Sequence, residues 1–421
     1  MTSSTEQVWD TAANRRALRL LVSHSPRIDD PQSTARALRL VSDIVQRRGA
    51  PTEIFQIPGT MPLVVVGHGP ILLLTHLDDP HPSAQGDEPG PPSMAGDVVT
   101  APGITRKAGV LAALGAVLGD EEIAELVTLV IEADRHDGST AFASWLENPE
   151  RNIAGALLEV ADLPIPAPAV FLAATGVVTI GVIVQDNGVS VERAYGGVQP
   201  DVGHLLVSTL SALKSVEGEV LVPRFYDGVV TPDANGLAAL RNVATSVGAW
   251  LTRDVPPSDD QLSSSHLTLG AFLAPSIVVR DVRLDGTGPY LPRAATAEIE
   301  ARIMPGQDAA TVARSIATFV LERIPDALVE TLLLRPSAKA SAFDAPLLEE
   351  IAPIIPVAIG NSPAGLLDSL AVPHLGFSTV WRDPAALDEQ ISMSAIMRHS
   401  QTLRALVRVM AQATGTVEPP R

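Results

Sequence analysis

Apolar and polar residues repeat with helical spacing in two early stretches, VWDTAANRRALRLLVSH and DDPQSTARALRLVSDIVQRRG, within residues 6–49. The second stretch opens on Asp, Pro and Ser and stops at Gly49, which are start and stop signals of a helix. Three short β-rich runs follow, IFQIP, PLVVVG and PILLLTH, separated by proline and glycine. A helix near 109–119 and the strand LVTLVIEAD come next. Strands that alternate with helices predict an α/β fold with a mostly parallel sheet.

The pattern changes after the strand GALLEVAD and the proline-rich connector LPIPAPAV. The runs VVTIGVIVQD, GEVLVPRF and TAEIEARIM alternate as half-buried antiparallel strands do, and DAATVARSIATFVLERI and ALVETLLLRP add a helix and a strand. From about Phe343 the α/β character returns, and it ends in the helix SQTLRALVRVMAQAT. We therefore expect a discontinuous catalytic-type domain, 1–170 and 343–421, interrupted by an inserted α+β domain at 171–342.

Composition narrows the class of protein. A chain of 421 residues predicts two or three domains, and 46% hydrophobic residues with 19% charged residues and a mean hydropathy of +0.22 indicate a globular protein. We expect no membrane span and no membrane partner. The net charge of -18 disfavours nucleic acid and anionic lipid as partners. Without cysteine or a secretory pattern at the N-terminus, we expect a cytoplasmic protein with no thiolate metal site.

Polar side chains gather where the predicted strands end. In parallel sheets, ligands bind at the carboxyl ends of the strands. The residues at those ends here are His76, Asp78, Glu132, Asp134, Arg135 and His136. A buried strand that ends in a histidine and carboxylates is typical of the start of a metal site.

Several motifs together resemble one family. They are THLD at 75–78, IEADRHDGS at 131–139, YGGV at 195–198, VPRFYDGV at 222–229, LPRAATAEIEARIMPGQD at 291–308 and LDEQI at 387–391. In order and spacing they resemble the co-catalytic zinc exopeptidases and aminoacylases of the carnosinase and carboxypeptidase G type. The resemblance implies a two-zinc catalytic domain, an inserted lid domain that often dimerises, and attack of water on the amide of a dipeptide or N-acyl amino acid.

Part of the family's site is present in this sequence. The resemblance implies that His76 is the first metal histidine, that Asp78 orients it, and that Asp162 is an acidic ligand of the same metal. It also implies that Arg302 binds the carboxylate of a substrate, with Asn361 as a further polar contact in the segment AIGNSPAG. These residues would support recognition of a small amino-acid-like ligand.

The residues that the family uses for catalysis are replaced. Thr105 stands at the bridging aspartate, Arg135 at the general base, and His136 at a glutamate ligand. Ala385 stands where the last metal histidine is expected, and Val191 where a histidine would stabilise the oxyanion. Arginine cannot accept a proton, so the usual base is missing. The resemblance therefore implies a degraded metal site on a conserved scaffold.

Alternatives remain open for the individual residues. Arg135 is expected to pair with Asp162 or Asp78, and His76 with Asp78 could be a structural pair. The cofactor is either none or a single divalent ion, zinc, held by His76, His136 and Asp162. Arg302 could equally form an ion pair with Glu298 or Glu300 of its own strand.

Three functions compete. The first is a protein that binds a small dipeptide-like or N-acyl amino acid-like molecule and has lost dizinc hydrolysis. The resemblance also implies a possible homodimer through the inserted domain. The second is an enzyme of amide or ester hydrolysis, or of acyl transfer, with one metal or none, in which Asp78, Arg135 and His136 are the candidate catalytic groups. The third is an ordinary dizinc dipeptidase or carboxypeptidase whose ligands have shifted to Asp134 or Asp137.

Overall fold

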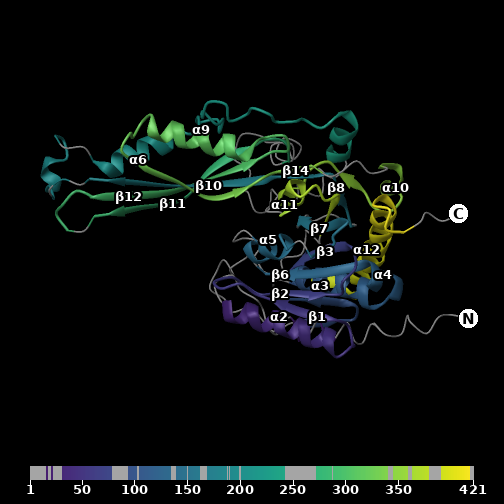
Figure 1. Ribbon diagram of the computed structural model, residues 1–421. Helices are drawn as coiled ribbons and strands as arrows, with labels where there is room; N and C mark the ends of the chain where they lie inside the picture. The colour runs from purple at the N-terminus through teal and green to yellow at the C-terminus, as the bar shows by residue number, and fades with distance from the viewer. Residues whose placement is uncertain are drawn as a thin grey trace, which may run out of the picture. The chain divides into compact units, whose positions relative to one another are not determined.

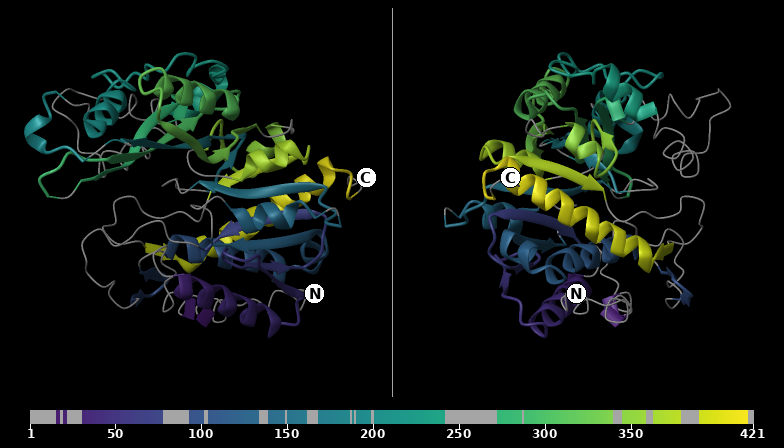
Figure 2. Two further views of the ribbon diagram at one scale, coloured as in Figure 1. Left: turned by 60° about the vertical axis from the view of Figure 1, so that its left-hand side comes forward. Right: turned by 90° about the vertical axis from the view of Figure 1, so that its right-hand side faces the viewer.

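The computed structural model divides the chain into two compact units (Figures 1 and 2). The large unit consists of Met1–Ala174, Pro232–Phe272 and Lys339–Arg421, and the small unit of Thr175–Thr231 and Leu273–Ala338. The residues that the structure describes are 16–17, 20–21, 31–77, 93–101, 104–133, 139–148, 150–161, 168–186, 188, 190–198, 201–241, 272–286, 288–339, 345–358, 363–378 and 390–417.

An eight-stranded sheet forms the centre of the large unit, in the order β1-β2-β6-β3-β7-β16-β8-β15. The strands are β1 (Thr52–Phe55), β2 (Leu63–Val66), β3 (Ile71–His76), β6 (Val127–Glu132), β7 (Gly155–Ala161), β8 (Val170–Phe171), β15 (Ile354–Ile355) and β16 (His374–Ser378). The central pairs β6-β3, β3-β7 and β7-β16 are parallel, whereas β1 and β2 run antiparallel at one edge. The expected mixed α/β fold with a mostly parallel sheet is confirmed.

Helices cover this sheet, whose central strands β3 and β6 are buried along their whole length. Every residue of β3 is buried, as is typical of a strand covered on both faces. The helices are α2 (Pro31–Gln46), α3 (Ile104–Leu118), α4 (Glu121–Leu126), α5 (Thr140–Leu146), α10 (Ala345–Glu349), α11 (Ala364–Ser369) and α12 (Met393–Ala413). Residues of α2, α3 and α12 share one buried cluster with Ile71, Leu73 and Leu157 of the sheet. The α3 helix lies beside α12, where the Ser400 hydroxyl donates to the carbonyl of Ala112 over 2.8 Å.

The chain also forms two smaller sheets. A three-stranded sheet contains β4 (Ser93–Ala95), β5 (Val98–Thr100) and β17 (Gln390–Ser392), and β9 (Ala173–Ala174) pairs with β14 (Ala338–Lys339).

The small unit is an antiparallel sheet with helices on one face (Figure 1). Its strands, in the order β11-β12-β10-β13, are β10 (Gly176–Gln185), β11 (Ser276–Asp285), β12 (Ala294–Ile303) and β13 (Leu328–Arg335). The helices are α6 (Val202–Ser211), α9 (Ala309–Leu321) and the 3-10 turn η1 (Arg193–Tyr195). Burial alternates strictly along β12, and its buried residues pack with α6 and α9 in one core. The predicted alternation holds along β12 and along the second half of β10, whereas the first five residues of β10 are all buried.

Some local predictions were wrong. The run GEVLVPRF at 218–225 is no strand: Val220 makes a single isolated bridge to Lys214, and turns follow. Pro223 has no N–H to donate, and Arg224 has a positive φ of 63°, so the chain cannot continue in a sheet. The last helix begins at Met393, earlier than expected, because Ser392 caps it by accepting from the N–H of Ala395.

The small unit lies in the chain between Ala174 and Lys339, and the expected domain bounds, 1–170 and 343–421 around 171–342, stay a prediction. The segment Pro232–Phe272 groups with the large unit although it lies inside the expected insertion. None of the helices among the described residues is long and apolar enough to cross a membrane.

Candidate functional site

The first group of polar side chains lies where β3 and β6 end. His76 and Glu132 are partners in the parallel register, and both side chains are fully buried. His76 Nδ1 lies 2.8 Å from Glu132 Oε1. The Ser139 hydroxyl donates to the same carboxylate oxygen over 2.8 Å. Ser139 precedes α5 and has a φ of 52°, an unusual value for a non-glycine residue, so the turn into α5 is held in a strained conformation.

The other ring nitrogen of His76 contacts the backbone, and this contact identifies the nitrogen that carries a hydrogen. His76 Nε2 lies 2.9 Å from the backbone carbonyl oxygen of Glu159. A carbonyl oxygen only accepts, so Nε2 carries a hydrogen, and Nδ1 is the nitrogen that faces Glu132. Ser139 contacts the Glu132 carboxylate, and that carboxylate contacts His76. In a catalytic triad the serine hydroxyl contacts the histidine instead, so Ser139 is not arranged as a nucleophile.

Glu159 was missed in the sequence analysis, although it is the residue that joins two polar clusters. Its backbone holds His76, and its fully buried side chain accepts from the Thr75 hydroxyl and lies 3.4 Å from Arg106 Nη1. The α3 helix approaches closely, since a Cβ at Gly109 would lie 3.3 Å from Glu159 Oε2. A charged residue inside the apolar run GALLEVAD was the available signal, because acids are rarely buried without a partner.

The start of α3 adds positive charge to this region. Arg106 is 3% exposed and Lys107 is fully buried. Thr105, the residue at the family's bridging aspartate, is 8% exposed beside them. The N-terminal end of a helix carries a partial positive charge of its own. Arg106 therefore brings a positive charge to the ends of β3 and β7, close to Glu159.

Several expected site residues lie outside the described residues: Asp78, Arg135, His136, Asp162 and Asn361. Their roles, and the expected pairing of Arg135, stay predictions.

The donor groups in the described part of the site can be compared with the needs of a zinc ion. No group of three or more His, Cys, Asp or Glu residues suited to a metal occurs in the described part of the chain. His76 and Glu132 offer at most one nitrogen and neighbouring oxygens, whereas zinc takes three or four donors. The described residues do not by themselves fit a metal ion, and a single zinc would depend on His136 and Asp162.

Arg302, the expected carboxylate-binding residue, lies on β12 of the small unit. Its Nη2 donates to the carbonyl oxygen of Ala274 over 2.8 Å, and burial lowers the pKa of its guanidinium. Glu300, one alternative partner, instead lies 3.4 Å from Arg280. Val191, at the position of the oxyanion histidine, is half-buried and offers no polar side chain.

Comparisons with known proteins identify the fold. No protein-family model matches the sequence, and no curated protein sequence is similar to it. Among solved structures, an M20 family metallo-carboxypeptidase, Sso-CP2 from Sulfolobus solfataricus, has a TM-score of 0.78 at 16% identity, over 94% of this chain and 99% of that one. Human carnosine dipeptidase 1 has a TM-score of 0.72 at 16% identity, over 96% of this chain and 97% of that one. The di-peptidase Dug1p from Saccharomyces cerevisiae has a TM-score of 0.73 at 13% identity, over 98% and 99%. The chain therefore has the fold of the dizinc exopeptidases and aminoacylases that the motifs resemble.

Proposed function

We propose that this protein uses a metallopeptidase fold to bind a small dipeptide-like or N-acyl amino acid-like molecule in the cytoplasm, and that classical dizinc hydrolysis is lost. The observation that carries the proposal is the state of His76. Its imidazole is fully buried, with Nε2 donating to a backbone carbonyl and Nδ1 facing Glu132. In this arrangement both ring nitrogens of His76 face protein groups, so the ring links the ends of β3, β6 and β7.

The sequence supports the same conclusion at the remaining positions. Thr105 cannot bridge two zinc ions as a carboxylate does, and Arg135 cannot act as a base. Ala385 and Val191 have no group to replace a metal ligand or an oxyanion donor. These losses remove the parts of the site that act on the reaction and leave those that recognise a ligand.

Charge explains how the fold tolerates the loss of zinc. Two zinc ions would bring four positive charges to a nest of acidic residues. In this chain Arg106 and Lys107 are buried at the start of α3, and Arg106 lies 3.4 Å from Glu159. A buried guanidinium can stabilise the Glu159 carboxylate, in place of a metal ion, through a charge-assisted hydrogen bond. Arg302 and Asn361 are the residues that we assign to ligand binding.

The first test measures metal content and ligand binding on the same sample. We expect mass spectrometry to find no stoichiometric zinc in the purified protein, and calorimetry to detect binding of alanyl-alanine or N-acetylalanine without hydrolysis. His76→Ala serves as the comparison. Two zinc ions per chain together with hydrolysis would refute the proposal and restore a dizinc peptidase. One ion that disappears in His76→Ala, with turnover, would instead support the enzyme with a single metal.

We also propose that the protein forms a homodimer through the small unit. The edge strand β11 leaves its backbone unpaired on one side within the described sheet. Four apolar residues of this strand are exposed by 41–51%: Val278, Val279, Val282 and Leu284. An exposed apolar edge strand is a template for pairing with a second chain. A second copy of β11 would supply the missing backbone hydrogen bonds.

A further inference from the structure

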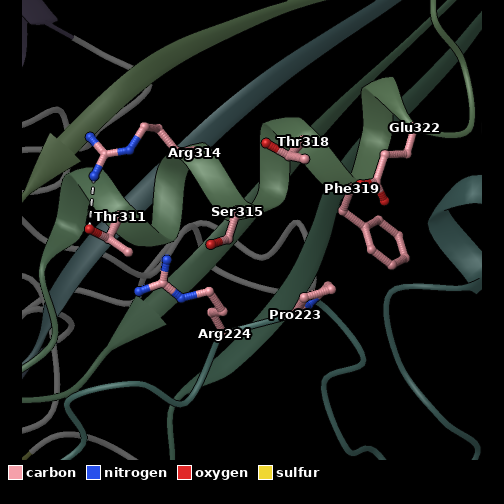
Figure 3. A pocket seen from close by; sticks show the side chains of 8 residues that line it. All are labelled: Pro223, Arg224, Thr311, Arg314, Ser315, Thr318, Phe319 and Glu322. Atoms are coloured by element: carbon pink, nitrogen blue, oxygen red, sulfur yellow. Dashed lines mark hydrogen bonds between the residues drawn. The ribbon is translucent and has the colours of Figure 1, made fainter.

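A groove lies on the surface of the small unit, and none of the residues assigned to the site above lines it. It runs between the turn at Pro223–Arg224 and one face of α9, with a volume of about 470 Å³ (Figure 3). Hollows of about 300–1,000 Å³ are large enough for a small organic molecule. Its lining combines two arginines, three hydroxyl groups and an aromatic ring.

Arg224 lines the groove with a strained backbone. Its φ of 63° lies in the left-handed region, where glycine is the favoured residue. The turn is fixed in this conformation by its contacts, because the Gln307 side chain donates to the carbonyl of Phe225 over 2.6 Å. A Cβ at Gly228 would lie 2.5 Å from the carbonyl oxygen of Gly306, so the two segments also pack tightly. Backbone strain that the surroundings hold in place is often found where a side chain has a function.

Two guanidinium groups are available at this end of the groove. Arg224 Nε donates to Asp227 Oδ2 over 2.8 Å, and its two terminal nitrogens make no hydrogen bond to the described residues. Arg314 Nη2 donates to the Thr311 hydroxyl over 2.9 Å and lies 3.9 Å from Asp308. In Figure 3 the Ser315 hydroxyl lies beside Arg224, and the Arg314 guanidinium lies at the Thr311 hydroxyl. Guanidinium forks beside a hydroxyl suit the oxygens of a carboxylate or phosphate.

The other half of the groove is apolar and ends in an acid. Phe319 lines this half but is only 2% exposed, and the guanidinium carbon of Arg323 lies 3.5 Å from its ring centroid. Pro223 lies opposite this part of α9 (Figure 3). Glu322 stands beyond the ring, so a long polyanion would meet repulsion there.

We propose that this groove binds a small organic anion. A carboxylate or phosphate group is held by Arg224, Arg314 and Ser315, and an attached apolar group rests on Pro223, at the edge of the buried Phe319. A site of this kind gives the small unit a ligand of its own. The proposal does not rest on the function proposed for the large unit.

The experiment is calorimetry at constant ionic strength with four probes: phenyl phosphate, phenylacetate, inorganic phosphate and the neutral phenylacetamide. We expect phenyl phosphate or phenylacetate to bind at least tenfold more tightly than inorganic phosphate and phenylacetamide. Which of the two anions binds better identifies the head group. If neither binds at millimolar concentration, or if inorganic phosphate binds equally well, the proposal is wrong.

Variants separate this site from general attraction by charge. Arg224→Gly removes the guanidinium and relieves the backbone strain, so its melting temperature should equal or exceed that of the parent while the affinity for the better probe falls at least tenfold. Arg314→Gln should lose a similar factor. Arg283→Gln is the control, because this arginine is 80% exposed on β11 and pairs with Asp281. Equal losses in Arg283→Gln, or full binding by Arg224→Gly, would overturn the assignment.

Discussion

At the scale of single residues, Glu159 decides how the ends of β3, β7 and α3 are held together. Its carboxylate accepts a hydrogen bond from the Thr75 hydroxyl and faces Arg106, and its backbone carbonyl accepts one from the His76 ring. These contacts join residues 53 to 84 positions apart in the chain. One buried acid thus links the histidine of the first motif to the cations of α3.

Replacing Glu159 should therefore be costly. Glu159→Ala is expected to lower the free energy of unfolding by about 3–5 kcal/mol, because Arg106 would stay buried without this carboxylate. Urea unfolding of the variant beside the parent measures the loss. The control is Glu217→Ala, which removes an exposed acid of the small unit. Equal stability of the two variants would show that Glu159 does not hold the cluster.

A second residue, His399 on α12, predicts a dependence of stability on pH. Its ring is buried near Phe377, with 6.0 Å between ring centroids, and neither nitrogen has a hydrogen-bond partner among the described residues. Burial lowers the pKa of His399 from 6.5 to about 4. As the pH falls from 6.5 to about 4, His399 therefore binds a proton in the unfolded chain but stays neutral in the folded chain. Stability should fall by about 3 kcal/mol over this interval and be unaffected above it.

Comparison with His399→Leu isolates this effect. The variant keeps an apolar side chain in the core and has no group to protonate, so it should lose less stability than the parent between pH 6.5 and 4. Urea midpoints at several pH values provide the measurement. Parallel pH profiles of parent and variant would contradict the account.

At the scale of elements, close approach of backbone segments limits which residues are allowed. A Cβ at Gly69 would lie 2.0 Å from the carbonyl carbon of Leu126, where α4 passes into β6. The start of β3 can therefore reach β6 only with glycine at this position. At Gly197, in contrast, a Cβ would meet nothing within 4 Å.

These two glycines form a matched pair of substitutions. Gly69→Ala should destabilise the large unit by about 3 kcal/mol or more, because the backbone of β6 must move away from β3. Gly197→Ala should change stability by about 0.5 kcal/mol or less, as expected for an open surface position. Thermal unfolding followed by circular dichroism compares them. If Gly69→Ala has the same melting temperature as the parent, the two segments do not approach as closely as we describe.

At the scale of the whole molecule, the proposed homodimer makes a prediction about mass in solution. Sedimentation equilibrium should show a dimer, and Val282→Lys should shift it to a monomer by placing a charge on the exposed edge of β11. Leu370→Lys, an exposed apolar position of the large unit, should leave the dimer intact. A parent protein that sediments only as a monomer would exclude the dimer.

The sequence by itself determined the class of fold and the edge of the sheet where polar residues gather. Buried strands such as ILLLTH are recognisable because a strand covered on both faces must be apolar throughout. The motifs named the family whose fold the structure shares. The alternating pattern of GEVLVPRF predicted a strand that does not form. Pro223 has no N–H for a sheet, and Arg224 has a positive φ.

Only the tertiary structure decided which side chains meet. The pairing of His76 with Glu132 depends on the register of two strands, and the pairing of Glu159 with Arg106 depends on how α3 packs on the sheet. The groove beside Arg224 likewise requires a turn and a helix that are distant in sequence. Hydrophobic patterns specify which face of an element is buried, but contacts between distant residues follow from close packing of the whole core.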